Sequence, residues 1–96
     1  MELKARYFGP GKWASPECIR FLTLALAGEV GELANLVKKA WREGKVDQSQ
    51  TVREELADIG IYHVMLAEAL GVDLVFEIER KLKIVNARRL RSREAL

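Results

Sequence analysis

Residues 15–44, SPECIRFLTLALAGEVGELANLVKKAWREG, decide the fold class of this chain. Ser15 suits the N-cap of a helix, Pro16 suits the first helical position, and Glu17 is favourable at the positive end of the helix dipole. Apolar residues then occur on more than one face of the helix, and Gly44 is the residue type most often found just past a helix C-terminus. The segment therefore predicts a long helix that ends at about Glu43.

Two further helices are predicted downstream. Thr51 is followed three residues later by Glu54, which is the capping-box spacing, so a second helix is expected from "TVREE" through "LADIGIYHVMLAEAL" to Gly71. The polar stretch "KVDQSQ" links it to the first helix. Asp73 suits the cap of a third helix, "LVFEIERKLKIVNARR", which we expect to fray into "LRSREAL". The apolar spacing there fits a helix better than the alternation of a strand.

The predicted fold class is all-α, an antiparallel helical bundle of three main helices. The stretch "ELKARYF" could add a short N-terminal helix before "GPG" breaks it. With 96 residues we expect one domain, 1–96, with an N-terminal segment 1–14 and a basic tail 90–96. Because the first helix is apolar all round and a short chain has few partners for it, we expect a homodimer or homotetramer to complete the bundle.

Composition and charge narrow the class of protein. Apolar residues are 49% and charged residues 31% of the chain, which excludes overall disorder. Cys18 is the only cysteine, so no disulfide framework or zinc cluster exists. No apolar leader and no uncharged stretch of about 18 residues is found, so we expect a cytoplasmic protein without membrane segments. Residues 80–96 carry seven basic side chains and one acidic one, while the other 79 residues carry 9 basic and 13 acidic.

Two pairs of acids are embedded in the apolar segments. Glu29 and Glu32 are three residues apart and so lie on one helix face, and Glu55 and Asp58 repeat the spacing on the second helix. If these helices pack antiparallel, the four carboxylates converge, and their repulsion requires a counter-charge. Mg²⁺, with Mn²⁺ as a substitute, is the natural one because carboxylate oxygens suit hard cations. A solvated face with surface ion pairs remains the alternative.

The same residues carry a family resemblance. "LALAGEVGELANLVKKAWREG" (24–44) followed by "EELADIGIYHVMLAEALGVDL" (54–74) resembles the MazG-type all-α nucleoside triphosphate pyrophosphohydrolases, with E-x-x-E on one helix and E-x-x-D on the next. The resemblance implies Mg²⁺-dependent hydrolysis of the α–β phosphoanhydride of a (d)NTP, giving (d)NMP and pyrophosphate, in the house-cleaning of nucleotide pools. It also implies that Glu29, Glu32, Glu55 and Asp58 hold the metal ions and are the catalytic residues.

Five residues outside the acidic set are candidates for substrate binding. Lys39 lies seven residues after Glu32 and returns to nearly the same helix face. Lys81, Asn86 and Arg88 lie on the third helix, and the first two resemble the family's third-helix lysine and polar residue. Trp13 precedes the first helix and could stack on a base. Surface charge, a complement to the helix dipole, and core packing are their ordinary explanations. The candidates are Lys39, Lys81, Asn86, Arg88 and Trp13.

Two alternatives to an active pyrophosphohydrolase stay open. Gly28 stands where many relatives carry an additional acid, so the chain could be a weak member of the family that only binds nucleotides. A small helical nucleic-acid-binding or regulatory protein could instead use "ARRLRSR" on phosphates. That second alternative leaves the embedded acids unexplained, so nucleic acid is not the partner we expect.

Overall fold

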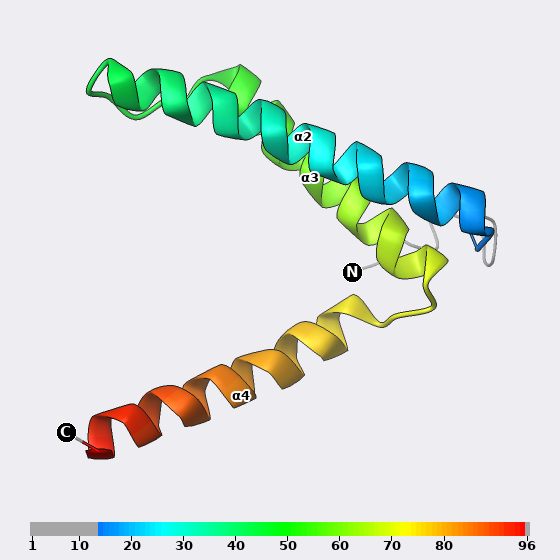
Figure 1. Cartoon of the computed structure of the whole chain (residues 1–96), viewed down its shortest axis with the longest axis vertical. Coiled ribbons are helices and arrows are strands. Elements are labelled where there is room, and N and C mark those ends of the chain that lie inside the picture. The colour runs from blue at the N-terminus through cyan, green and yellow to red at the C-terminus, as the bar shows by residue number, and fades with distance from the viewer. Residues whose placement is uncertain (1–13, 96) are drawn as a thin grey trace.

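The computed structural model describes residues 14–95, and three helices account for most of them (Figure 1). They are α2 (Pro16–Arg42), α3 (Gln50–Ala69) and α4 (Leu74–Ala95). Residues 14–95 contain no strand, so the predicted all-α class is confirmed. No single helix in this range is long and apolar enough to cross a membrane, and α3 with α4 meets that description only as a pair bent by 100°.

The predicted N-caps of the first and third helices are confirmed. The Ser15 hydroxyl accepts a hydrogen bond of 3.2 Å from the backbone N–H of Cys18. The Asp73 carboxylate accepts one of 3.1 Å from the N–H of Phe76. Each side chain thus satisfies one of the N–H groups that has no partner inside its helix. The expected fraying was wrong, because α4 continues to Ala95.

Two glycines end α2 and α3 as the sequence predicted. Gly44 and Gly71 both have φ +68°, a left-handed conformation that costs other L-residues energy. The N–H of Gly44 donates to the carbonyl of Trp41 at 3.0 Å, and that of Gly71 donates to the carbonyl of Glu68 at 3.1 Å. These bonds satisfy carbonyls in the last helical turn, so the chain leaves both helices in the same tight geometry.

The start of α3 differs from the prediction. Ser49, and not Thr51, is the N-cap, and its hydroxyl accepts from the N–H of Val52 at 3.4 Å. The N–H of Ser49 in turn donates to the Asp47 carboxylate at 2.9 Å, which forms a turn immediately before the helix. This turn fixes Ser49 in an extended conformation, so Thr51 falls inside the first helical turn.

Replacing Ser49 with alanine should lower the free energy of unfolding by about 1 kcal/mol, because the N–H of Val52 loses its acceptor. Thr51→Ala is the matched control, since it also removes one hydroxyl within the same turn. It should change stability by less than about 0.5 kcal/mol. Urea unfolding followed by circular dichroism measures both. A larger loss for Thr51→Ala would contradict the observed cap.

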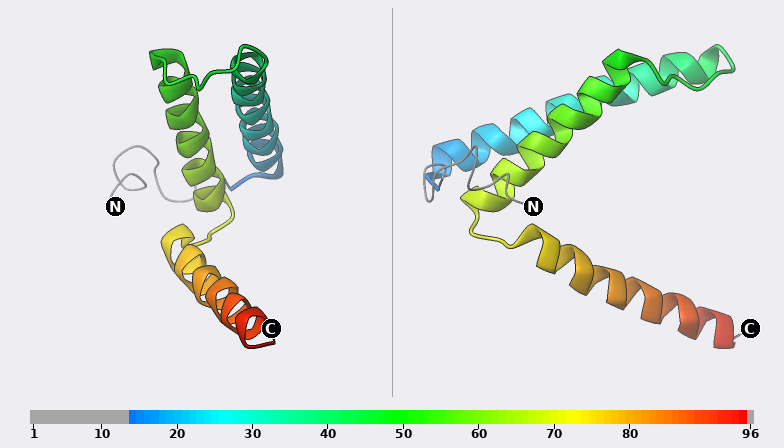
Figure 2. Two further views of the ribbon diagram at one scale, coloured as in Figure 1. Left: turned by 90° about the vertical axis from the view of Figure 1, so that its left-hand side faces the viewer. Right: turned by 180° about the vertical axis from the view of Figure 1, so that it is seen from behind.

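Helices α2 and α3 run antiparallel and pack along each other (Figures 1 and 2). Leu22 of α2 is the one large side chain among the described residues that is fully buried. Small residues fill most of the remaining core, which keeps the two helices close but buries little apolar surface. These smaller core residues are Ala40, Val52, Ala67 and Ala69.

Helix α4 diverges from the α2–α3 pair and barely contacts it (Figures 1 and 2). The radius of gyration is 17.2 Å. A compact chain of this length would have a value of about 12.5 Å. The antiparallel arrangement is therefore confirmed for two helices, while the third does not close a bundle within its own chain.

Candidate metal centre

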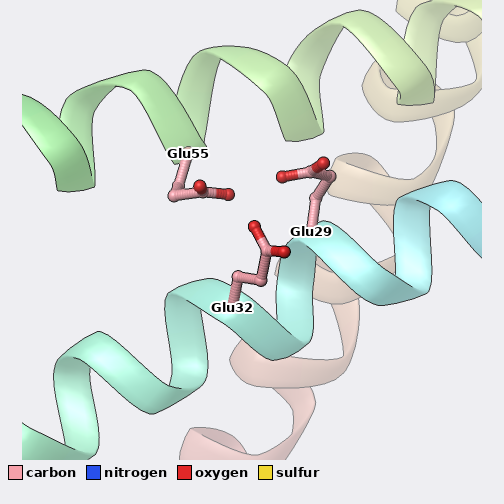
Figure 3. Close-up of side chains that lie close together, drawn as sticks. All are labelled: Glu29, Glu32 and Glu55. Atoms are coloured by element: carbon pink, nitrogen blue, oxygen red, sulfur yellow. The ribbon is translucent and has the colours of Figure 1, made fainter.

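Three of the four predicted acids meet between α2 and α3 (Figure 3). Glu29 and Glu32 project from α2, and Glu55 projects from α3 toward them. One carboxylate oxygen of each lies within 4.8 Å of the others. The spacing of three residues aligns the first two side chains on one helix face, and the antiparallel packing of α3 brings the third opposite them.

Asp58, the fourth predicted acid, lies outside this group. It is half-buried on α3, three residues beyond Glu55. Three residues correspond to a rise of about 4.5 Å along a helix, so Asp58 is displaced by nearly one turn. Its role as a metal ligand stays a prediction.

The cluster is electrostatically unbalanced. One carboxylate oxygen each of Glu29 and Glu55 is buried and has no hydrogen-bond partner among the described residues. The pKa of Glu55 is raised to about 7, first because its carboxyl faces that of Glu29, and also because of desolvation and the charge of Glu32. Two ionised carboxylates have no proton to donate to each other. The contact therefore requires either a shared proton or a cation.

The donor set fits a hard divalent cation. The cluster offers carboxylate oxygens, and among the described residues no cysteine or histidine completes it. Mg²⁺ binds a few carboxylates and keeps waters or phosphate oxygens in its remaining positions. The buried, unpartnered oxygens of Glu29 and Glu55 are the groups that such an ion would neutralise. The three glutamates can thus hold a metal ion.

Glycines beside the acids do not serve close packing within the described chain. A Cβ atom added at Gly28, Gly31 or Gly60 would meet nothing within 4 Å. Each helical glycine costs up to about 1 kcal/mol relative to alanine, with no compensating contact here. That these glycines leave room for a ligand or a neighbouring helix stays a prediction. Within the described chain, no side chain or helix occupies that room.

The metal-free protein should become more stable as the pH falls from about 8 to about 5.5. Glu55 has a pKa of about 7 in the folded chain and an ordinary value of 4.5, so between these values the folded state binds more protons. Stability from this group is complete below the lower value and is lost as the pH rises through the upper one. Thermal melts in EDTA across this range measure the effect. The Glu55→Gln variant should lose this part of the pH dependence, and an unchanged profile would contradict the assignment.

The predicted substrate-binding residues do not gather at the cluster. Lys39 is exposed and lines a separate pocket of about 320 Å³ near the loop between α2 and α3, together with Lys45 and Asp47. Trp13 lies outside the described residues. The other three candidates are exposed on α4, which diverges from the pair that holds the acids. These three are Lys81, Asn86 and Arg88.

Comparisons with known proteins were consistent with one another. A family model described as MazG-like family matches residues 16–94. Gene 37 protein of Mycobacterium phage L5 is 36% identical over 89 residues, covering 88% of this chain and 78% of the phage protein. dCTP pyrophosphatase 1 of Homo sapiens is 37% identical over 95 residues, and the protein of the same name from Rattus norvegicus is 37% identical over 81. The chain spans 54% and 46% of these two, and no solved structure matches it significantly.

Proposed function

Because the chain belongs to the MazG-like family, we propose that it is a Mg²⁺-dependent nucleoside triphosphate pyrophosphohydrolase that cleaves a (d)NTP to (d)NMP and pyrophosphate. The observation that carries this proposal is the meeting of Glu29, Glu32 and Glu55, with buried oxygens that lack partners. The relatives named dCTP pyrophosphatase 1 support a deoxynucleoside triphosphate as substrate. Removal of unwanted nucleotides is the role that we propose for this activity.

The acids would act together on the triphosphate. Bound Mg²⁺ supplies charge neutralisation for the phosphates and lowers the pKa of a water molecule. Glu29 and Glu32 offer oxygens to the ion from α2, and Asp58 remains the proposed fourth ligand. Glu55 faces Glu29 and Glu32 from α3, and one of the three glutamates would accept the proton of that water.

The proposal includes self-association in the cytoplasm, as a homodimer or homotetramer. Large apolar side chains are exposed on every helix, among them Phe21 at 61%, Trp41 at 80% and Phe76 at 58%. Leaving such surface in water forfeits about 1.5–3 kcal/mol for each side chain that could be covered. Substrate contacts from Lys39, Lys81, Asn86, Arg88 and Trp13 are then proposed for the assembled protein.

Incubation with a panel of ordinary and modified NTPs and dNTPs, dCTP included, tests the activity. We expect monophosphate and pyrophosphate in equal amounts, and no cleavage when EDTA replaces Mg²⁺. Ion-exchange chromatography separates the products, and the Glu55→Gln variant purified in parallel controls for contaminating enzymes. Release of orthophosphate and a diphosphate would contradict the proposed bond. Salt-sensitive binding of DNA or RNA without pyrophosphate release would support a nucleic-acid-binding protein instead.

A further inference from the structure

The C-terminal part of α4 carries a dense group of arginines, which we call the arginine cluster. Four of the nine arginines of the chain fall within residues 88–93, and this stretch contains no lysine and no acid. All six residues of the stretch are exposed. Among residues 14–95 no ion pair involves the cluster, whereas Arg80 of the same helix pairs with Glu77 at 3.1 Å. The cluster consists of Arg88, Arg89, Arg91 and Arg93.

The helix dipole explains only the end of the arginine cluster. A dipole favours cations at a helix C-terminus, but its effect falls off within the last turn. α4 ends at Ala95, so Arg93 lies in the last turn, and Arg88 and Arg89 precede it. Arg89 and Arg93 are four residues apart, a spacing at which like charges destabilise a helix. An anionic partner would neutralise these charges and remove the repulsion.

The arginine cluster and the acidic cluster lie on separate elements. The three glutamates meet between α2 and α3, whereas α4 barely contacts that pair and runs away from it toward its C-terminal end (Figures 1 and 2). The sequence alone did not favour nucleic acid as a partner, because that role leaves the embedded acids unexplained. In the structure one role does not exclude the other, since a polyanion can approach the end of α4 without meeting the glutamates.

We propose that the arginine cluster binds the phosphate backbone of duplex DNA without regard to base sequence. Guanidinium groups recognise phosphate through two parallel hydrogen bonds, which a lysine ammonium does not form, and the stretch contains arginine alone. Arg88 is also a candidate for substrate binding, so the proposal rests on Arg89, Arg91 and Arg93. It is independent of the cleavage of nucleotides.

The placement of the arginines fits the major groove of B-form DNA. Arg89 and Arg93, four residues apart, lie on one side of α4. Arg88 and Arg91, three residues apart, lie on another, roughly 150° around the axis. A helix with its side chains is about 10–12 Å wide, and the major groove is about 12 Å wide with a phosphate backbone on either side. Arginines on two sides of α4 can therefore contact both strands.

A membrane surface fits this end of α4 less well than DNA does. A helix that lies in a membrane interface carries apolar side chains on one face and basic side chains on the other over the same length. In α4 the two kinds of side chain follow one another along the axis. Its large exposed apolar side chains lie before residue 86, and Leu90 is the exception. This arrangement favours a polyanion in solution.

Fluorescence anisotropy of a labelled 20-base-pair duplex of arbitrary sequence, titrated with the full chain, tests the proposal. EDTA is present, so that no metal ion bridges the protein and the phosphates. The logarithm of the binding constant should fall linearly with the logarithm of the KCl concentration. Neutralisation of one phosphate by each of the three arginines gives a slope of about −2.7, so binding should weaken roughly 40-fold between 50 and 200 mM KCl.

The triple variant Arg89→Gln/Arg91→Gln/Arg93→Gln should weaken binding at least tenfold at 50 mM KCl and flatten the slope by about 2.7. Glutamine is a good helix former, so α4 should persist in circular dichroism. The matching triple lysine variant keeps the charges and should retain the slope. All these variants should cleave nucleotides as the parent does, because none of the three arginines is assigned to the substrate.

A second triple variant, Arg20→Gln/Arg42→Gln/Arg53→Gln, is the matched control. It removes the same charge from exposed positions on α2 and α3. It should leave the slope unchanged and weaken binding by less than about threefold, through long-range charge alone. Equal weakening by the two glutamine variants would overturn the proposal, because net charge and not the arginine cluster would then bind DNA.

Three further outcomes would also overturn the proposal. Unchanged anisotropy with 50 mM KCl and excess protein would exclude DNA as the partner. Equally tight binding of single-stranded DNA or of duplex RNA, whose major groove is deep and narrow, would exclude the groove contact. Binding of phosphatidylserine vesicles without binding of DNA would make α4 a membrane-surface helix. Nucleotide cleavage by the parent protein is scored separately, so this proposal and the proposed function fail independently.

Discussion

Glu55→Gln should lower Mg²⁺-dependent nucleotide cleavage by more than about 100-fold. Loss of a residue that only supports a metal ligand already costs about 10–100-fold, and Glu55 is a direct member of the cluster. The same change should raise stability in EDTA at about pH 8, because it removes one carboxylate from a group of three without a counter-charge. The expected result is therefore an inactive protein that melts at a higher temperature than the parent when no metal is present.

Glu54→Gln is the matched control for this experiment. Glu54 is the preceding residue of the same helix, has the same side chain and is exposed. Its replacement should change neither activity nor the melting temperature in EDTA by a measurable amount. Steady-state cleavage and thermal melts with and without Mg²⁺ measure both variants. If Glu55→Gln loses activity and also loses stability in EDTA, the glutamate is structural and the cluster is not a metal centre.

Leu22→Ala should destabilise the protein by about 2–5 kcal/mol, because a buried leucine leaves a cavity when it is truncated. Leu22 is 0% exposed, and the remaining core consists mainly of small residues, so no neighbour is placed to refill the space. For a domain of this size the melting temperature should fall by more than about 10 °C. Many single-domain proteins have little more stability than this to lose.

Leu24→Ala controls for the loss of a leucine from the same helix. Leu24 is 72% exposed and does not line the apolar pocket on α2, so we expect a change below about 1 kcal/mol. Both variants should be melted at one protein concentration, because self-association makes the melting temperature depend on concentration. Equal losses of stability in the two variants would contradict the burial of Leu22 in the α2–α3 core.

Helix ends were predictable from the sequence where a single local side chain decides them. Ser15 and Asp73 each lie immediately before an apolar segment and have no competitor nearby, and both are the observed caps. Ser49 and Thr51 compete for the start of α3, and the sequence pattern favours Thr51 because Glu54 follows at the right distance. The choice depends on the backbone of the preceding loop, where Asp47 holds Ser49, and a pattern of residue types does not contain that geometry.

The site was predictable to the extent that it follows from two helices and a short loop. The spacing of Glu29 and Glu32 and the antiparallel return of Glu55 are consequences of helical periodicity. Asp58 shares that periodicity, yet its place depends on the rotation of α3 about its own axis, which is set by core packing. Lys81 and Asn86 were predicted to bind the substrate at the same site, but they lie on α4, which diverges from the pair that holds the acids. The direction in which α4 leaves that pair depends on tertiary packing, which the local pattern of α4 does not contain.

The arrangement of the acids within one helical hairpin has a kinetic consequence. Glu29 and Glu55 belong to helices joined by a short turn, so their approach requires only sequence-local contacts, which form rapidly in folding. The self-association proposed above is an encounter between two chains, and its rate depends on protein concentration. Assembly from an unfolded chain should therefore occur in a fast first-order step that gathers the glutamates, followed by a slower second-order step in which the copies associate.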